Sequence, residues 1–217
     1  MAVEENGYAT STWSAVAQHP LRLRATSSWL LQPDAETMLA RSATRPPADQ
    51  GVCGQTGLMR RRLIVLRHAK SDWSGGVADH DRPLAGRGRR EAALAGRWLR
   101  ENAADIDLVV CSSAKRARQT WKLVAKQLDN VPPARVDDRL YAASLRGLLA
   151  IVSKLPDSAR AVLLIGHNPG LEELVADLGG VGWPMKTSSI AVLSSRSEWA
   201  EVGARWAKLE VSLTPRS

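Results

Sequence analysis

The chain has 217 residues, of which 44% are hydrophobic and 24% are charged, a composition typical of a globular protein with enough apolar material for a core. Its formal net charge of +8 favours an anionic partner, but the arginines are scattered and no aromatic residues alternate with them, so we expect no nucleic-acid binding. Cys53 and Cys111 are too few for a disulfide framework or a zinc cluster, and no run approaches the ~18 apolar residues of a membrane span. We therefore expect a cytoplasmic protein that does not associate with membranes.

Residues 1–58 differ in composition from the rest of the chain. They contain clusters of Ser, Thr, Pro and Gly, and residues 45–51 have the Pro and Gly content of a linker. We expect a poorly structured N-terminal extension: a regulatory arm, a targeting segment or, as we favour, translation begun upstream of the natural start. Met59 stands directly before the first predicted strand, and residues 59–217 are long enough to form a domain by themselves.

The first strand is predicted from four consecutive aliphatic residues, 63–66, which indicate a strand buried on both faces. It leads directly into Arg67-His68. A loop rich in turn residues follows at 75–84, and a helix is predicted over 87–101. The glycines of Gly86-x-Gly88 are interpreted as a turn before this helix, because the motif is too short for a dinucleotide fingerprint.

The remaining pattern alternates strands and helices. The predicted elements are a strand over 107–111, a helix over 114–128, a very short strand at Val136, a helix over 144–155, a strand over 161–165, a helix over 171–178, and strand-like segments at 190–193 and 205–213. This order predicts an α/β fold with three layers (α/β/α), a mostly parallel sheet with helices on both faces, and an antiparallel edge.

Polar residues follow three of the predicted strands. Arg67-His68 ends the first, Lys115-Arg116 follows the second, and His167 follows the strand over 161–165. Because the carboxyl ends of parallel strands share one edge of a sheet, these groups can meet around one anion. The arginines can hold phosphoryl oxygens, one histidine can attack phosphorus, and the other can stabilise the transition state. Since the arginines and a protonated histidine would supply the positive charge, we expect no metal or other cofactor.

A cysteine phosphatase mechanism is not supported by the spacing around Cys111. Such enzymes need an arginine six positions after the cysteine, and Ala117 occupies that position. Cys111 is therefore expected to be a buried strand residue.

The polar motifs resemble those of the histidine phosphatase superfamily, which includes the phosphoglycerate-mutase-like enzymes. Leu66-Arg67-His68-Ala69 is similar to its Arg-His-Gly signature, residues 112–120 match its Ser-x-x-x-Arg-Ala-x-Gln-Thr stretch, and Gly166-His167-Asn168-Pro169 matches its second histidine. The compact core and the loop at 81–84 are most similar to the SixA-like phosphohistidine phosphatases. The resemblance covers about residues 60–215.

This resemblance implies a histidine phosphatase domain over 59–217 with the phosphoglycerate-mutase-like fold. It implies that His68 becomes a transient phosphohistidine and that Arg67, Arg116 and His167 form the phosphate pocket. Lys70 and Arg82 are expected to bind substrate.

The sequence departs from the family pattern in two places. Ala69 replaces the signature glycine, and we expect the extra methyl group to be tolerated. The mutase-like members carry an acidic proton donor on an inserted segment, whereas Tyr141-Ala142 offers no carboxylate there. A missing acid suits a phosphoramidate, whose nitrogen can be protonated before it departs. The residues that remain as possible acids are Asp72, Asp79, Asp81 and His80.

The sequence therefore predicts a metal-independent phosphatase, a hydrolase of phosphohistidine or phosphoric monoesters, that works through a phosphohistidine intermediate. Its leading partner is a protein carrying phosphohistidine, as for the SixA-like enzymes. A small phosphorylated metabolite is the alternative substrate. A non-catalytic module that binds phosphate or phosphoproteins is the alternative from another functional class.

Overall fold

The structure is a computed structural model, and it describes residues 60–216. The predicted N-terminal extension, 1–58, lies outside the described residues, so its interpretation stays a prediction. The strands are β1 (Arg61–Arg67), β2 (Leu108–Ser112), β3 (Ala134–Asp137), β4 (Ala161–Gly166), β5 (Ile190–Ser195) and β6 (Lys208–Leu213). The helices are α1 (Gly86–Asn102), α2 (Lys115–Ala125), α3 (Leu145–Val152) and α4 (Gly170–Gly179), with short 3-10 helices η1 (Asp79–Asp81), η2 (Asp138–Leu140) and η3 (Trp199–Glu201).

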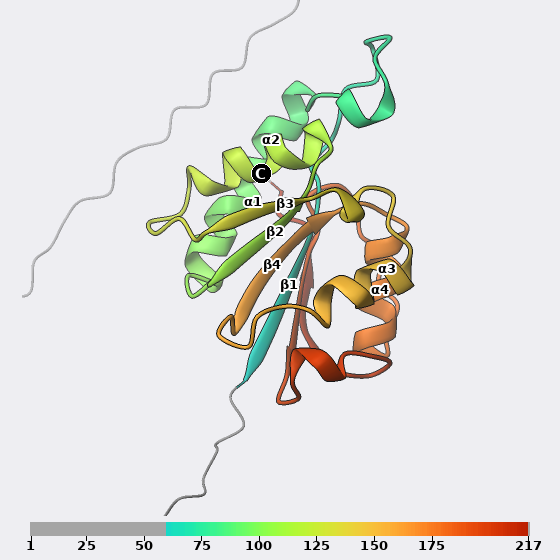
Figure 1. Cartoon of the computed structure of the whole chain (residues 1–217). Helices are drawn as coiled ribbons and strands as arrows, with labels where there is room; N and C mark the ends of the chain where they lie inside the picture. Colours follow the sequence, from blue (N-terminus) through green and yellow to red (C-terminus); the bar gives the residue numbers. More distant parts are fainter. Residues whose placement is uncertain (1–59, 217) are drawn as a thin grey trace, which may run out of the picture. The chain divides into compact units, whose positions relative to one another are not determined.

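The strands form one mixed sheet in the order β3-β2-β4-β1-β5-β6. β3, β2, β4 and β1 are mutually parallel, whereas β5 is antiparallel to β1 and β6 is antiparallel to β5. Helices α1 and α2 cover one face, and α3 and α4 cover the other (Figure 1). The predicted three-layer α/β/α fold with an antiparallel edge is confirmed.

The central strand β1 has four consecutive aliphatic residues, 63–66, between arginines at its two ends, because both faces of its middle are buried. Leu63 and Val65 belong to the core shared with α3 and α4, whereas Ile64 and Leu66 belong to the core shared with α1 and α2. β4, its parallel neighbour, alternates in the same way. A strand covered on both sides cannot show polar alternation, which is why a continuous aliphatic run predicted it.

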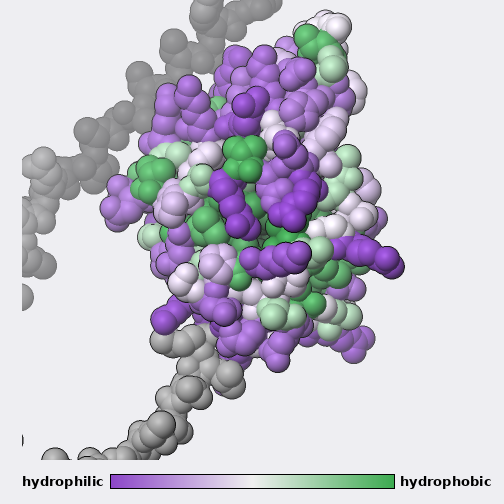
Figure 2. All heavy atoms as spheres, viewed as in Figure 1, coloured by the Kyte–Doolittle hydropathy of each residue, from purple (hydrophilic) through white to green (hydrophobic). Residues whose placement is uncertain are grey.

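Two smaller predictions concern residues beside these elements. Cys111 is buried in β2, as predicted, and burial raises the pKa of its thiol to about 12. Gly86 and Gly88 do not form a separate turn, because they lie in the first turn of α1. The surface seen in Figure 2 is mainly hydrophilic, with hydrophobic residues in small separate groups. None of the described helices is long and apolar enough to cross a membrane.

Candidate active site

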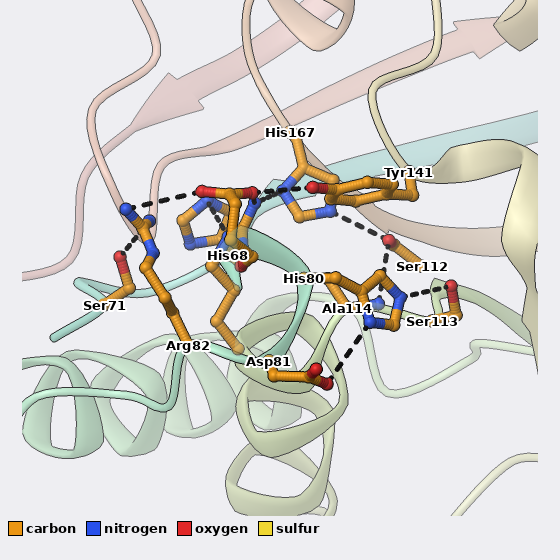
Figure 3. A network of polar contacts seen from close by, with 12 residues as sticks. His68, Ser71, His80, Asp81, Arg82, Ser112, Ser113, Ala114, Tyr141 and His167 are labelled. Atoms are coloured by element: carbon orange, nitrogen blue, oxygen red, sulfur yellow. Dashed lines mark hydrogen bonds and ion pairs between the residues drawn. The ribbon is translucent and has the colours of Figure 1, made fainter. Parts of the chain in front are cut away.

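The carboxyl ends of β1, β4 and β2 bring three predicted residues together. His68 directly follows β1, His167 directly follows β4, and Arg116 lies in the first turn of α2 after β2. The two imidazole rings have centroids 4.9 Å apart, and all three side chains are buried. Figure 3 shows the two histidines side by side between Arg82 and Tyr141. The expectation that parallel strand ends would gather these groups is therefore correct.

The hydrogen bonds of His68 define which ring nitrogen is free to react. Its Nδ1 lies 2.8 Å from the backbone oxygen of Ala69, and a carbonyl oxygen can only accept, so Nδ1 carries the proton. Nε2 therefore has the lone pair, and it accepts from Nε of Arg116 at 3.3 Å. The strand end fixes His68 with a nucleophilic nitrogen facing a guanidinium.

His167 has the opposite arrangement of donor and acceptor. Its Nδ1 lies 3.3 Å from Nη2 of Arg116, which can only donate, so Nδ1 accepts. Its Nε2 lies 2.8 Å from Oγ of Ser112 and donates to that hydroxyl in the neutral ring. The Arg116 guanidinium thus donates a hydrogen bond to each histidine. It lies between the two ring nitrogens that an anion bound to both rings would contact.

Burial keeps both histidines neutral in the empty site. Desolvation, followed by the nearby arginine charges, lowers the pKa of His68 to about 4. Desolvation, the neighbouring His68 and Arg116 lower the pKa of His167 to about 3. The sequence interpretation used a protonated histidine as a source of positive charge, but in this state the positive charge comes from the arginines.

Arg116 is also bound by a loop that the family motifs did not single out. Its Nη1 donates to the backbone oxygen of Asp79 at 2.6 Å, and its Nη2 donates to Oδ2 of Asp79 at 3.0 Å. The same carboxylate accepts from the hydroxyl of Tyr141 at 2.8 Å. The Tyr141 ring stands edge-on to His167, with ring centroids 5.7 Å apart. Asp79 and Tyr141 therefore form one wall of the site.

The other predicted residues differ in how they relate to this pocket. Arg67 donates through Nη1 to the backbone oxygen of Met185 at 2.6 Å, and its charge contributes to the low pKa of both histidines. Arg82 is buried and donates to Oγ of Ser71 at 2.8 Å. Lys70 has an exposed side chain, and its backbone, not its amine, contacts α1.

Arg82 is held on the pocket side by an exposed aromatic ring. Its guanidinium carbon lies 3.3 Å from the centroid of the Trp73 ring, a cation–π contact. Nη1 lies 3.4 Å from the carboxylate of Asp79, and Nε has no hydrogen-bond partner. A buried guanidinium with free N–H groups is suited to an incoming anion.

Two residues of the 112–120 motif, Gln119 and Thr120, bind the loops around the pocket instead of pointing into it. Oγ1 of Thr120 accepts from the backbone N–H of Ala69 and donates to the backbone oxygen of Arg116. Oε1 of Gln119 accepts from the backbone N–H of Leu84 at 2.7 Å. The methyl group of Ala69 is buried against Leu84, where this sequence departs from the family glycine. α2 therefore holds both the His68 loop and the loop that carries Asp79.

The four candidate acids occupy different places. Asp72 is partly buried and accepts from Ser74, and Asp81 is exposed beside His80. Nε2 of His80 is 3.0 Å from Oγ of Ser113 (Figure 3). Only Asp79 contacts Arg116 directly among these four. Within residues 60–216, no group of three His, Cys, Asp or Glu side chains could hold a metal ion.

The comparisons with known proteins agree with this geometry. Residues 63–145 match the model of the histidine phosphatase superfamily (branch 1). A solved structure of a candidate SixA phosphohistidine phosphatase from Nakamurella multipartitia is 31% identical, with a TM-score of 0.64 over 73% of this chain and 98% of that one. The chain belongs to the histidine phosphatase superfamily.

Two further proteins are similar to most of the described chain. An uncharacterized protein from Mycobacterium tuberculosis is 41% identical over 162 residues, 70% of this chain and all of that protein. The protein histidine phosphatase SixA, solved with tungstate, is 27% identical with a TM-score of 0.62, over 71% of this chain and 97% of that one. The resemblance inferred from the three motifs is confirmed at the level of the superfamily.

Sequence reasoning did not assign Tyr141 to the site and left Asp79 as one of four alternatives. Their hydrogen bond joins residues 62 positions apart, and the bond from Arg116 to Asp79 spans 37 positions. The sequence signal that could have pointed to Asp79 is the turn-rich loop before α1, because its acidic and basic residues come soon after His68.

Proposed function

We propose that this protein is a metal-independent phosphatase in which Nε2 of His68 accepts the phosphoryl group and then passes it to water. The observation that carries the proposal is the bond from Nδ1 of His68 to the Ala69 carbonyl, because it leaves the Nε2 lone pair facing Arg116. A neutral histidine with a fixed tautomer is a competent nucleophile near neutral pH.

The arginines provide the electrostatic part of the mechanism. When phosphorus approaches Nε2 of His68, its oxygens can take the N–H groups that Arg116 now directs at the two histidines. Arg67 adds positive charge near both rings, and Arg82 adds it near His68. His167, held by Ser112, has its Nδ1 lone pair on the Arg116 side, so it can donate to a phosphoryl oxygen only after Nδ1 takes up a proton, a step that the negative charge of the dianion favours. The donors are already gathered at one point, but Arg116 must exchange its present partners, the two histidines and Asp79, for the phosphoryl oxygens.

For the substrate we propose phosphohistidine on a protein. The likeness to SixA structures supports this choice. The chemistry also supports it, because the leaving nitrogen of a phosphoramidate can be protonated before the bond breaks. Such a substrate does not depend on a strong acid in the enzyme.

A small phosphorylated metabolite is the second candidate, and one observation favours it. The carboxylate of Asp79 reaches the pocket through Arg116, so a carboxyl group is available beside the reacting centre. An alkyl phosphate ester needs a proton donor for its alkoxide, and a positioned acid typically contributes about 10²–10⁴-fold.

Trapping the intermediate tests the phosphoenzyme route. The enzyme is denatured with base during turnover of a radiolabelled aryl phosphate, because an acid quench would hydrolyse phosphohistidine. We expect an acid-labile, base-stable phosphate on the protein, absent from His68→Ala. His80→Ala is the matched control, because it removes a histidine of the same rim and should still form the adduct. An adduct that persists in His68→Ala would contradict the assignment. Phosphate binding without adduct or turnover would indicate a binding module.

A further inference from the structure

The carboxylate of Asp79 occupies the donors that the proposed function assigns to substrate. It accepts from Nη2 of Arg116 at 3.0 Å and from the hydroxyl of Tyr141 at 2.8 Å, and it lies 3.4 Å from Nη1 of Arg82. In Figure 3, Arg82 and Tyr141 flank His68 and His167 on opposite sides. Asp79 thus bridges the two sides of the pocket with a negative charge.

A phosphoryl dianion and an ionised Asp79 cannot share this position without strong repulsion. The hydroxyl of Tyr141 first, and then the charges of Arg116 and Arg82, hold the pKa of Asp79 below its usual range. A bound dianion would take the N–H groups of both arginines and replace their charge with its own. Both changes favour the neutral carboxyl, since like charges close together disfavour ionisation.

We propose that Asp79 is the proton donor to the leaving group, and that it gains its proton when a phosphoryl dianion takes its place on Arg116. This rests on the phosphoenzyme route proposed above. As the Nε2–P bond to His68 forms and the bond from phosphorus to the leaving oxygen or nitrogen breaks, the proton moves from Asp79 to the leaving atom. In the second half, the water oxygen bonds to phosphorus, the Nε2–P bond breaks, and the water proton returns to Asp79.

The other candidate acids are placed less well for this step. His80 contacts Ser113 and the edge of the Tyr141 ring rather than Arg116, and Asp81 lies beside His80. Asp72 accepts from the backbone and hydroxyl of Ser74 within its own turn. The hydroxyl of Tyr141 has its proton directed at Asp79, and that hydrogen bond raises the pKa of Tyr141. Tyr141 is therefore a positioning residue for the Asp79 carboxyl.

Several other groups around Asp79 can change their protonation or carry charge when an anion binds. His68 and His167 have lowered pKa values that a dianion would raise. The titratable and charged side chains in question are His68, Arg67, His80, Arg82, Arg116, Tyr141 and His167. A test must therefore separate proton uptake by Asp79 from uptake by the histidines.

Calorimetry with tungstate as the dianion makes this separation. Titrations of the full chain at pH 7, in buffers of different ionisation enthalpy, give the number of protons taken up on binding. We expect Asp79→Asn to take up about one proton fewer than the wild type. Asp81→Asn is the matched control, because it removes the exposed carboxylate two residues away, and its uptake should equal that of the wild type. Equal uptake by Asp79→Asn and the wild type would overturn the proposal.

The dependence of rate on the leaving group tests the proton transfer itself. Phenyl phosphate releases a poor leaving group, whereas dinitrophenyl phosphate releases one that needs no proton. We expect Asp79→Asn to lower kcat/KM for phenyl phosphate by about 10²–10⁴-fold and to affect dinitrophenyl phosphate much less. An equal loss for both substrates would mean that Asp79 only positions Arg116, and no loss for either would also refute the assignment.

The outcome for Asp79 can be distinguished from the outcome for the phosphoenzyme route. If the wild type traps no phosphohistidine, the route fails whatever Asp79 does. If the wild type traps it and Asp79→Asn retains the wild-type rate on phenyl phosphate, only the role of Asp79 fails. Because the same carboxylate accepts the water proton, Asp79→Asn should also accumulate more phosphoenzyme from dinitrophenyl phosphate than the wild type does.

Discussion

At the scale of single residues, the neutral state of the two buried histidines gives a direct prediction. Desolvation lowers the pKa of His68 to about 4 and that of His167 to about 3. Their ring resonances, recorded by NMR on histidine-labelled protein, should therefore stay constant between about pH 5 and 8, where an ordinary histidine titrates. His80, which is half exposed, can be assigned by His80→Ala. A midpoint near 6.5 for His68 would contradict the neutral nucleophile.

The same depressed pKa values carry a consequence for stability. The unfolded chain protonates its histidines near the ordinary value of 6.5, whereas the folded chain protonates His68 only near 4. The unfolded state therefore binds more protons in the interval between these values, and stability falls as the pH falls through it. Above about pH 6.5 both states are neutral at this ring, so the contribution does not change further.

At the scale of elements, α1 approaches the loop after His68 so closely that only glycine fits. A Cβ atom at Gly88 would lie 2.0 Å from the backbone oxygen of Lys70. Gly88→Ala must therefore shift α1 or the reactive loop, and overpacking of this kind typically costs about 1–3 kcal/mol. Displacement of His68 by about 1 Å can lower kcat/KM by about 10²-fold. Denaturant unfolding and aryl phosphate kinetics measure the two effects.

Gly86 provides a matched control for this substitution. It lies in the same first helical turn, but a Cβ atom there would meet nothing within 4 Å. Gly86→Ala should therefore keep wild-type activity and leave stability unchanged or slightly higher, because alanine favours a helix more than glycine does. If both variants behaved alike, the close contact with Lys70 would not be the cause.

The elements also show which features a sequence can predict. β1 and β4 were predictable because a strand buried on both faces is apolar wherever it crosses the core, and each has a run of at least four aliphatic residues there. His68, Arg116 and His167 were predictable because parallel strand ends meet at one edge. Asp79 could not be singled out, since its position depends on how a loop folds back onto α2 and on a tyrosine from after η2. Such contacts are set by tertiary packing and leave no periodic signal.

At the scale of the whole molecule, residues 60–216 contain a buried core on each face of the sheet. Both faces of the sheet are covered by helices within residues 60–216. The first described residues are also fastened: Arg60 forms an ion pair with Glu210, and Arg61 forms one with Glu198. The start of β1 is thus held by ion pairs with residues of the same domain.

We therefore predict that a chain beginning at Met59 folds cooperatively and is as active as the full chain. Its thermal midpoint should lie close to that of the full chain, because the buried core lies within residues 60–216. In a domain of this size, a loss of about 1 kcal/mol in the free energy of unfolding would lower the midpoint by about 2–4 °C. Calorimetry and aryl phosphate kinetics on the two chains, measured side by side, provide the test. A midpoint lower by several degrees would mean that residues 1–58 pack on the domain. Unchanged stability with lower activity would instead indicate a regulatory arm that acts on the site.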